Sequence, residues 1–390
     1  MRVVVVAEYY PSPAQPALGI WAHRQALAAR ESGADVRVLV LHRALPTRAE
    51  LASGRPAAIA RALTQPLRER RDGLDVTRVP FLAPPRPLAY GAWGAFAAGP
   101  LAFALHRLRR AFPYDLVHAH YAAPAGDAVL RARPGTPLIV SVHGGDVLGV
   151  VESWPRLGAP AVRRALGAAR LVLANSAGIE ARCRQLGATE TRVVHLGTDL
   201  PAGVIAPSGD PHLVTVGDLV ARKRHADVLD ALWRLRESHP RLRWVVVGDG
   251  PERAGLERRA IELGLAERID FRGALAPAEA LTAARAGGVF VLPSVDEAFG
   301  VAYVEAMAGG VPAIGCAGEP GPEEIAASGG GLSRVSARDP VALARELARL
   351  LDDAAARAAQ GAAARETVSR SFTWERCGVE TVAAYSDALR

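Results

Sequence analysis

The stretch that decides the fold reads Pro293-Ser-Val-Asp-Glu297-Ala-Phe-Gly300-Val-Ala-Tyr-Val-Glu305-Ala-Met-Ala-Gly-Gly310-Val-Pro312. An apolar run over residues 288–292 precedes it, and a new apolar pattern begins near Val301. This order predicts a strand, then a loop, then a helix. Glu297 falls on the predicted loop and Glu305 on the predicted helix, so two carboxylates flank the glycine that opens the helix.

This arrangement indicates a site for a sugar nucleotide. A helix start offers unpaired backbone N–H groups and a positive dipole end, and a glycine lets a phosphate approach closely. An ionised carboxylate only accepts hydrogen bonds, so Glu297 can hold hexose hydroxyls while Glu305, about two helical turns along, reaches a ribose diol. The alternative is a solvated loop acid and a helix acid paired with arginine. We expect the diphosphate to lie on Ala298, Phe299, Gly300 and Val301.

These residues resemble the retaining glycosyltransferases of GT-B architecture, in particular glycosyltransferase family 4, also called glycosyl transferases group 1. The match consists of two acids separated by seven residues and the trailing Glu-Ala-Met-Ala-x-Gly-x-Pro at 305–312. The resemblance implies an α/β fold of two Rossmann-like, doubly wound parallel-sheet domains that face a central cleft. It also implies that Glu297 holds the donor hexose, as a catalytic residue, and that Glu305 holds the ribose.

Lys223 is the only lysine, so 46 of the 47 basic residues are arginine. It follows the apolar run 212–217, at a strand-to-helix turn where open α/β sheets bind ligands, and an ammonium is a point charge for phosphate. Chance retention on a solvated turn is the alternative. The family has Gly-Arg-Leu and then Lys-Gly here, and both basic residues grip the diphosphate. Because Asp218 replaces that arginine and Arg224 that glycine, we expect Arg222 to supply the missing charge beside Lys223.

Two histidine segments end predicted strands, Leu116-Val-His118-Ala-His120-Tyr and Ser141-Val-His143-Gly-Gly-Asp146. Histidines at such positions are often structural, but this edge of a parallel sheet is also where ligands bind. The family has a similar His-Gly-x-Asp element, whose histidine lies beside the donor sugar. The resemblance therefore implies a catalytic His143, and we expect acceptor contacts from His120 and Asp146. A metal is not expected, because neither a third histidine nor a carboxylate pair has ligand spacing nearby.

Two glycines are further donor-site predictions. Gly19 ends the loop 8–19 before a predicted helix at Ile20, where the family has a glycine that meets the donor phosphate or the acceptor. A glycine that only relieves a turn is the alternative. Gly250, in Val247-Gly-Asp-Gly250-Pro-Glu252, lacks the third glycine of a dinucleotide fingerprint but matches the family's equivalent turn. No Asp-x-Asp occurs, so we expect a reaction that needs no metal and no cofactor beyond the nucleotide sugar.

The chain has 390 residues, of which 50% are hydrophobic, enough for two domain cores. Valine-rich runs alternate with stretches of helical period in two series, which predicts parallel sheets. We expect an acceptor-binding domain over 1–200, a donor-binding domain over 201–371 after a loose segment 200–210, and a helix 372–390 that returns to the first domain. The predicted strands are 3–7, 36–41, 116–119, 138–142 and 171–174, then 213–216, 244–247, 269–271, 289–292 and 312–315.

We expect a cytoplasmic protein, because Met1-Arg-Val-Val-Val-Val is typical of a first strand and no apolar run is expected to reach the roughly 18 residues that span a bilayer. The three cysteines are widely spaced, which argues against disulfides and zinc.

The net charge is +7. The arginine-rich segment Arg43–Arg71 suits either an amphipathic helix on an anionic membrane, with a lipid-linked acceptor, or a solvated insert. Nucleic acid is not expected, because no reading motif accompanies the charge.

Three other functions remain open. A nucleotide-sugar epimerase shares this fold, but its family lacks the trailing Glu-Ala-Met-Ala element. A phosphorylase that uses pyridoxal phosphate needs a lysine for the Schiff base, and Lys223 lies in the wrong motif for that role. A non-catalytic subunit that binds a sugar nucleotide is compatible with Asp218.

Overall fold

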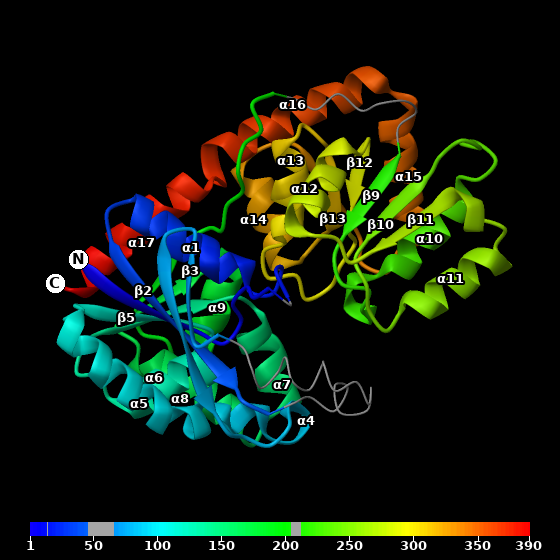
Figure 1. Ribbon diagram of the computed structural model, residues 1–390. Helices are drawn as coiled ribbons and strands as arrows, with labels where there is room; N and C mark the ends of the chain where they lie inside the picture. The colour runs from blue at the N-terminus through cyan, green and yellow to red at the C-terminus, as the bar shows by residue number, and fades with distance from the viewer. Residues whose placement is uncertain (14, 46–65, 204–211) are drawn as a thin grey trace. The chain divides into compact units, whose positions relative to one another are not determined.

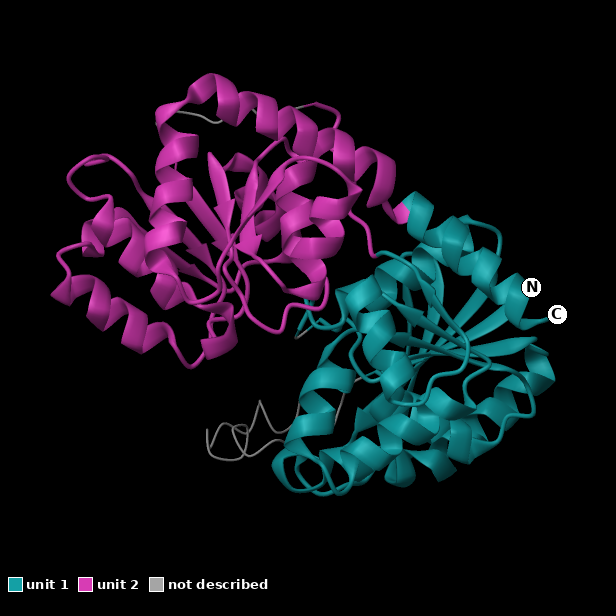
Figure 2. Ribbon diagram, turned by 180° about the vertical axis from the view of Figure 1, so that it is seen from behind, with its two compact units in different colours: residues 1–195, 375–390 teal, residues 196–374 magenta. Residues whose placement is uncertain are grey.

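The computed structural model describes residues 1–13, 15–45, 66–203 and 212–390 (Figure 1). These residues form two compact units, shown in different colours in Figure 2. Unit 1 comprises Met1–His195 and Glu375–Arg390, and unit 2 comprises Leu196–Trp374. The end of the chain therefore belongs to the same unit as its beginning.

The described residues of unit 1 form an eight-stranded sheet in the order β3-β4-β2-β1-β5-β6-β7-β8. Among these strands, only β3 runs antiparallel to its neighbour. Its strands are β1 (Arg2–Ala7), β2 (Asp35–Arg43), β3 (Arg68–Arg71), β4 (Leu74–Phe81), β5 (Leu116–His120), β6 (Leu138–Val142), β7 (Leu171–Ala174) and β8 (Thr191–Val193). Its helices are α1 (Ile20–Glu31), α4 (Arg86–Ala89), α5 (Trp93–Ala111), α6 (Asp127–Ala132), α7 (Val151–Ser153), α8 (Gly158–Ala168), α9 (Ala177–Gln185) and α17 (Trp374–Ala388).

Helices cover both faces of this sheet, with α5, α6 and α8 on one face and α1 and α17 on the other (Figure 1). The valines of β1 are fully buried because the strand is covered on both sides, which explains its unbroken apolar run. The chain leaves β1 toward β2 and later returns to β5 on its other side. The carboxyl ends of β1 and β5 therefore form the switch point at which such sheets bind ligands.

Unit 2 has a six-stranded, all-parallel sheet in the order β11-β10-β9-β12-β13-β14. Its switch point lies between β9 and β12. The strands are β9 (Leu213–Val216), β10 (Trp244–Val247), β11 (Ile269–Gly273), β12 (Val289–Val291), β13 (Ala313–Cys316) and β14 (Leu332–Val335). The helices are α10 (His225–Arg234), α11 (Arg253–Glu262), α12 (Pro277–Ala286), α13 (Val301–Ala308), α14 (Pro320–Ser328), α15 (Pro340–Asp352) and α16 (Ala354–Ser371).

The predicted strands all form, within a few residues of their predicted ends, and the two-sheet α/β fold is confirmed. Four further strands, β3, β4, β8 and β14, were not predicted. The three cysteines, Cys183, Cys316 and Cys377, are buried. Of the loose segment 200–210, residues 204–210 lie outside the described residues.

Two expectations about membranes need correction. The prediction of an amphipathic helix over Arg43–Arg71 is wrong at both ends of this segment, because Arg43 lies in β2 and Arg68–Arg71 form β3. Residues 46–65 lie outside the described part of the chain. The expectation that no apolar run reaches 18 residues is also wrong. Among the described residues, Arg86–Ala111 is long and apolar enough to cross a membrane by length and composition alone. Its inner side chains, such as Leu101 and Leu105, are buried in unit 1, which is typical of a core helix.

Candidate active site

In unit 2, the loops after β9 and β12 meet at the switch point of the sheet. The Val295 N–H donates to the Arg222 carbonyl at 2.9 Å, which joins the two loops. The Lys223 ammonium donates to Glu297 Oε2 at 2.5 Å, and one Arg222 nitrogen lies 3.9 Å from the same oxygen. Three residues predicted for the donor site, Arg222, Lys223 and Glu297, therefore come together although about 75 residues separate the two loops in sequence.

The Glu297 carboxylate is buried but remains ionised. Burial alone would raise its pKa, but the charges of Lys223 and Arg222 and the hydrogen bonds from Lys223 and Ser294 outweigh burial and hold its pKa below the usual range. The Ser294 hydroxyl donates to Glu297 Oε2 at 2.7 Å. The backbone N–H of Glu297 donates to Glu319 Oε2 at 2.9 Å. These contacts hold the carboxylate in one position before any ligand arrives.

Helix α13 begins at Val301, directly after Gly300 as predicted, and Gly300 has a left-handed conformation with φ +83°. A Cβ added there would lie 2.4 Å from the buried ring of Tyr303 and 3.4 Å from Glu297 Cγ, so the site requires glycine. Phe299 directs its ring into the core against Phe372, with ring centroids 5.6 Å apart. Only the backbone of Phe299 therefore remains for a ligand, and the side chain of Ala298 is buried as well.

Glu305 lies half-buried on α13, and burial raises its pKa to about 7 although Arg285 acts in the opposite direction. Arg285 Nε donates to the Glu305 backbone carbonyl at 3.2 Å, and another Arg285 nitrogen donates to Thr198 Oγ1 at 3.3 Å. Arg285 thereby connects α12, α13 and the start of unit 2.

Asp218 and Gly250 have different surroundings from those of the Lys223–Glu297 pair. Asp218 is exposed, beside the loop that carries Lys223. A Cβ at Gly250 would lie 2.4 Å from the Leu219 carbonyl oxygen, so glycine here lets the turn after β10 approach the loop after β9. This close packing explains why residue 250 is a glycine. The predicted contact of Gly250 with the donor stays a prediction.

In unit 1, His120, His143 and Asp146 also come together. The rings of His120 and His143 stack at 5.2 Å, and His120 Nδ1 lies 3.0 Å from His143 Nε2. Burial, followed by the proximity of His120, lowers the pKa of His143 well below its ordinary value, so His143 is neutral at pH 7. The Asp146 carboxylate accepts from the backbone N–H groups of Ala122 and His143 at 2.9 and 3.3 Å. His120 and Asp146 are both buried and both contact His143, so they hold it in position. Their contact with an acceptor stays a prediction.

Backbone conformation and close packing also explain why residue 19 is a glycine. It precedes α1 with φ +70°, and a Cβ there would lie 2.2 Å from the carbonyl group of Tyr9. The predicted loop and helix start are present, and glycine is needed for the loop to fold back on its own first residues.

A cluster of aromatic rings around Glu8 was not predicted. Tyr9 follows β1 and Tyr121 follows β5, and their ring centroids lie 5.1 Å apart at the switch point of unit 1. The Tyr90 hydroxyl donates to Glu8 Oε2 at 2.6 Å, and burial raises the pKa of Glu8 to about 7. The Trp21 ring lies 5.9 Å from that of His143. The signal was available, because Glu8 and Tyr9 follow a strand at the same sheet edge as the histidines.

Three ring nitrogens in this region are buried without a hydrogen-bond partner among the described residues, namely Trp21 Nε1, His120 Nε2 and His143 Nδ1. Buried polar atoms are normally paired. Unpaired ones beside aromatic rings at a switch point indicate that a ligand or water completes the site.

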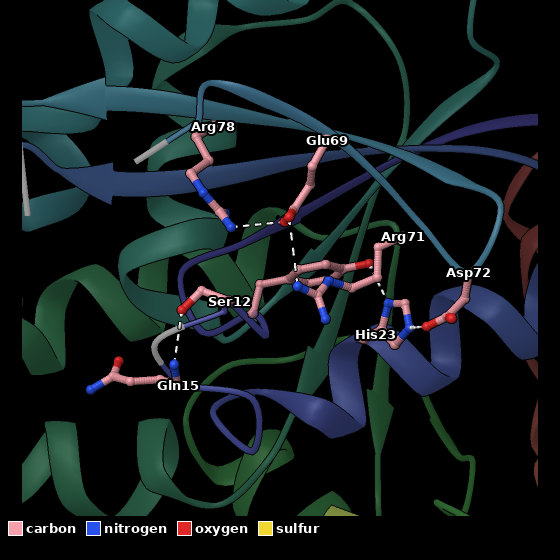
Figure 3. A network of polar contacts seen from close by, with 8 residues as sticks. Ser12, Gln15, His23, Glu69, Arg71, Asp72 and Arg78 are labelled. Atoms are coloured by element: carbon pink, nitrogen blue, oxygen red, sulfur yellow. Dashed lines mark hydrogen bonds and ion pairs between the residues drawn. The ribbon is translucent and has the colours of Figure 1, made fainter. Parts of the chain in front are cut away.

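A polar network holds the loop that carries Glu8 and Tyr9. Figure 3 shows the charged β3–β4 hairpin beside this loop. An Arg78 guanidinium nitrogen lies 2.8 Å from Glu69 Oε1, and His23 Nε2 lies 2.7 Å from Asp72 Oδ2. The other ring nitrogen of His23 lies 2.7 Å from the Tyr10 hydroxyl. The charged hairpin therefore fixes the loop between β1 and α1 from outside.

Comparisons with known proteins agree with this geometry. The models of "Glycosyltransferase Family 4" and "Glycosyl transferases group 1" match residues 18–201 and 199–367. The 2-deoxystreptamine glucosyltransferase of Streptomyces kanamyceticus is 30% identical, over 73% of this chain and 80% of that protein. Sucrose-phosphate synthase from Thermosynechococcus elongatus superposes with a TM-score of 0.80 at 21% identity, over 99% of both chains. Anabaena HepE, solved in complex with UDP and glucose, does so at 0.72 and 19%, over 99% of both. The chain therefore belongs to the glycosyl transferases of group 1, family 4, and has the GT-B fold.

Proposed function

We propose that this glycosyltransferase moves a hexose from a nucleoside diphosphate sugar to a hydroxyl acceptor, with retention at the anomeric carbon and without a metal ion. The acceptor is a polysaccharide, a glycolipid or a small molecule. The observation that carries the proposal is the Lys223–Glu297 pair at the switch point of unit 2, directly before the helix start at Gly300.

The chemistry assigned to these residues is electrostatic. The leaving diphosphate gains negative charge, and an ammonium, a guanidinium and a helix N-terminus stabilise it. Lys223 has three N–H donors, so it can keep its bond to Glu297 and still donate to a phosphate oxygen. Glu297, held ionised, accepts from the hexose hydroxyls, and Glu305 accepts from the ribose diol. Support for a nucleotide sugar comes from HepE, which has been solved with UDP-glucose bound.

The acceptor is assigned to unit 1. Aromatic rings suit the flat face of a sugar or cyclitol ring, and Glu8, next to the Tyr9–Trp21 ring pair, offers a carboxyl group for its hydroxyls. His143 is neutral, so its ring can either donate or accept one hydrogen bond. We place it beside the transferred hexose.

The test is thermal-shift and calorimetric binding of UDP, GDP, ADP and their hexose conjugates, with EDTA present. We expect one nucleotide to raise the melting temperature of the wild type, because a ligand that binds only the native state stabilises it by mass action. Lys223→Ala and Glu305→Ala should lose this shift, whereas Arg345→Ala, at an exposed position on α15, should keep it. The proposed donor site is contradicted if no nucleotide raises the melting temperature. It is also contradicted if EDTA abolishes the rise.

Turnover separates the remaining alternatives. Hexose transfer to a ring acceptor, with the anomeric configuration read by NMR coupling constants, supports a retaining transferase. Inversion of the sugar without an acceptor would indicate an epimerase. Binding of the donor without turnover on any acceptor would indicate a non-catalytic subunit.

A further inference from the structure

Four large apolar side chains of unit 1 are exposed on α5 or in the chain segment that leads into it. They are Leu82 at 65%, Leu88 at 62%, Phe96 at 45% and Phe103 at 68% exposure. Phe96 and Phe103 are seven residues apart on α5, so they share one helix face, about 10 Å apart along its axis. The opposite face of α5, including Leu101 and Leu105, is fully buried. Exposed apolar groups gathered in this way mark an interaction surface.

The same face of α5 becomes basic toward its end. His106, Arg107 and Arg110 are exposed there, one to two turns beyond Phe103. The whole segment Arg86–Ala111 contains four arginines and neither aspartate nor glutamate. A helix whose open face combines aromatic groups with arginines, and whose segment lacks acids, has the charge and polarity that an anionic membrane surface binds.

We propose that the exposed face of α5, defined by Phe96, Phe103, Arg107 and Arg110, binds the surface of an anionic lipid bilayer. The two phenylalanine rings enter the interface between headgroups and acyl chains, and the two arginines meet lipid phosphates. The helix lies flat and does not cross the bilayer, because its other face is packed inside unit 1. This surface lies on unit 1, whereas the proposed donor site lies in unit 2. In a cytoplasmic protein, the partner is the inner leaflet.

The experiment is co-sedimentation of the full chain with vesicles of phosphatidylcholine alone and of equal parts phosphatidylcholine and phosphatidylglycerol. We expect the wild type to pellet only with the anionic vesicles, less at high salt. Phe96→Ser with Phe103→Ser should reduce the partition coefficient about tenfold or more, because the apolar burial is lost. Arg107→Glu with Arg110→Glu should do the same through charge.

The matched control is Ile261→Ser, which removes an apolar side chain that is 69% exposed on α11 of unit 2. We expect it to pellet like the wild type. Nucleotide binding, measured in parallel, should be unchanged in every variant. The proposal is overturned if the wild type stays in the supernatant or if Ile261→Ser loses as much binding as the phenylalanine pair. A dimer in light scattering that dissociates on Phe103→Ser would assign the face to a second copy instead.

Discussion

Glu305 holds a carboxyl group in a place where its charge is unfavourable. Burial raises its pKa to about 7, from an ordinary value of 4.5. Between these two values the unfolded chain releases the proton and the folded chain keeps it, so the free energy of unfolding falls as pH rises from about 4.5 to 7 and stays low above. Glu305→Gln removes this loss. We expect the variant to be more stable than the wild type at pH 8, with a difference that disappears near pH 4.5.

Glu323→Gln is the control of opposite sign. A backbone hydrogen bond from Gly318 and the neighbouring Arg334 lower the pKa of Glu323, so its charge is favourable in the folded state. This variant should be less stable than the wild type at pH 8, and the difference should shrink as pH falls. Melting temperatures of the three proteins across this range decide the question. A Glu305→Gln effect that does not depend on pH would contradict the assigned cause.

Some residues of the candidate site could be predicted from the sequence, and others could not. Lys223, Arg222 and Glu297 were predictable because a lone lysine and a loop acid both follow strands, and parallel strands bring such loops together. The cluster around Glu8 was not predicted, because Trp21, Tyr90 and Tyr121 are far apart in sequence and aromatic residues are also common in cores. Gly19 and Gly250 were predicted to contact the donor. In the structure, a Cβ at either position would clash with nearby backbone atoms, so close packing alone explains the glycines.

At the level of elements, the start of α13 depends on Gly300. Alanine there would need the unfavourable φ of +83° and would place its Cβ against Tyr303, which is fully buried. We expect Gly300→Ala to lower the free energy of unfolding by more than the roughly 1–2 kcal/mol that left-handed backbone alone costs. Nucleotide affinity should fall at least tenfold, because the helix start moves. Denaturant titration and calorimetry measure the two effects.

Gly264→Ala separates backbone strain from the contact with Tyr303. Gly264 has a similar φ of +69°, but a Cβ there would meet no atom within 4 Å. This variant should lose only the backbone term and should keep its nucleotide affinity. If the two variants behave alike, the close packing at Gly300 does not matter.

Three of the four unpredicted strands, β3, β8 and β14, lie at sheet edges. The fourth, β4, lies between β3 and β2, but Asp75, Thr77 and Arg78 interrupt its apolar run. A strand at an edge is partly solvated, so it lacks the continuous apolar run of a central parallel strand. β3 is wholly charged, with the sequence Arg68-Glu-Arg-Arg71, and is held by pairing with β4 and by the Arg78–Glu69 ion pair. Such strands depend on tertiary contacts that local sequence does not reveal.

At the scale of the molecule, the last helix completes unit 1. The hydroxyl of Tyr385 on α17 lies 2.7 Å from Nδ1 of the buried His118, and Gln25 on α1 donates to Thr381 at 3.0 Å. Tyr385→Phe leaves the histidine nitrogen unpaired, which costs about 1–3 kcal/mol. We expect hydrogen exchange to accelerate in peptides from unit 1, including the first strand, and to stay unchanged in unit 2.

Val379→Ala tests whether any change on α17 has this effect. Val379 is 58% exposed on the same helix, so its loss should change exchange little. Equal acceleration in both units after Tyr385→Phe would mean that they unfold together and would contradict the independent behaviour expected of two separate cores.

The scarcity of lysine has a practical consequence for studying this enzyme. Reductive methylation with isotope-labelled formaldehyde modifies primary amines and leaves guanidinium groups untouched. In this chain it can label two positions, the N-terminus and Lys223. The Lys223 side chain is 12% exposed and bonded to Glu297. A single methyl resonance would therefore report on the proposed site, and its shift or its protection from labelling would follow occupancy by a nucleotide directly.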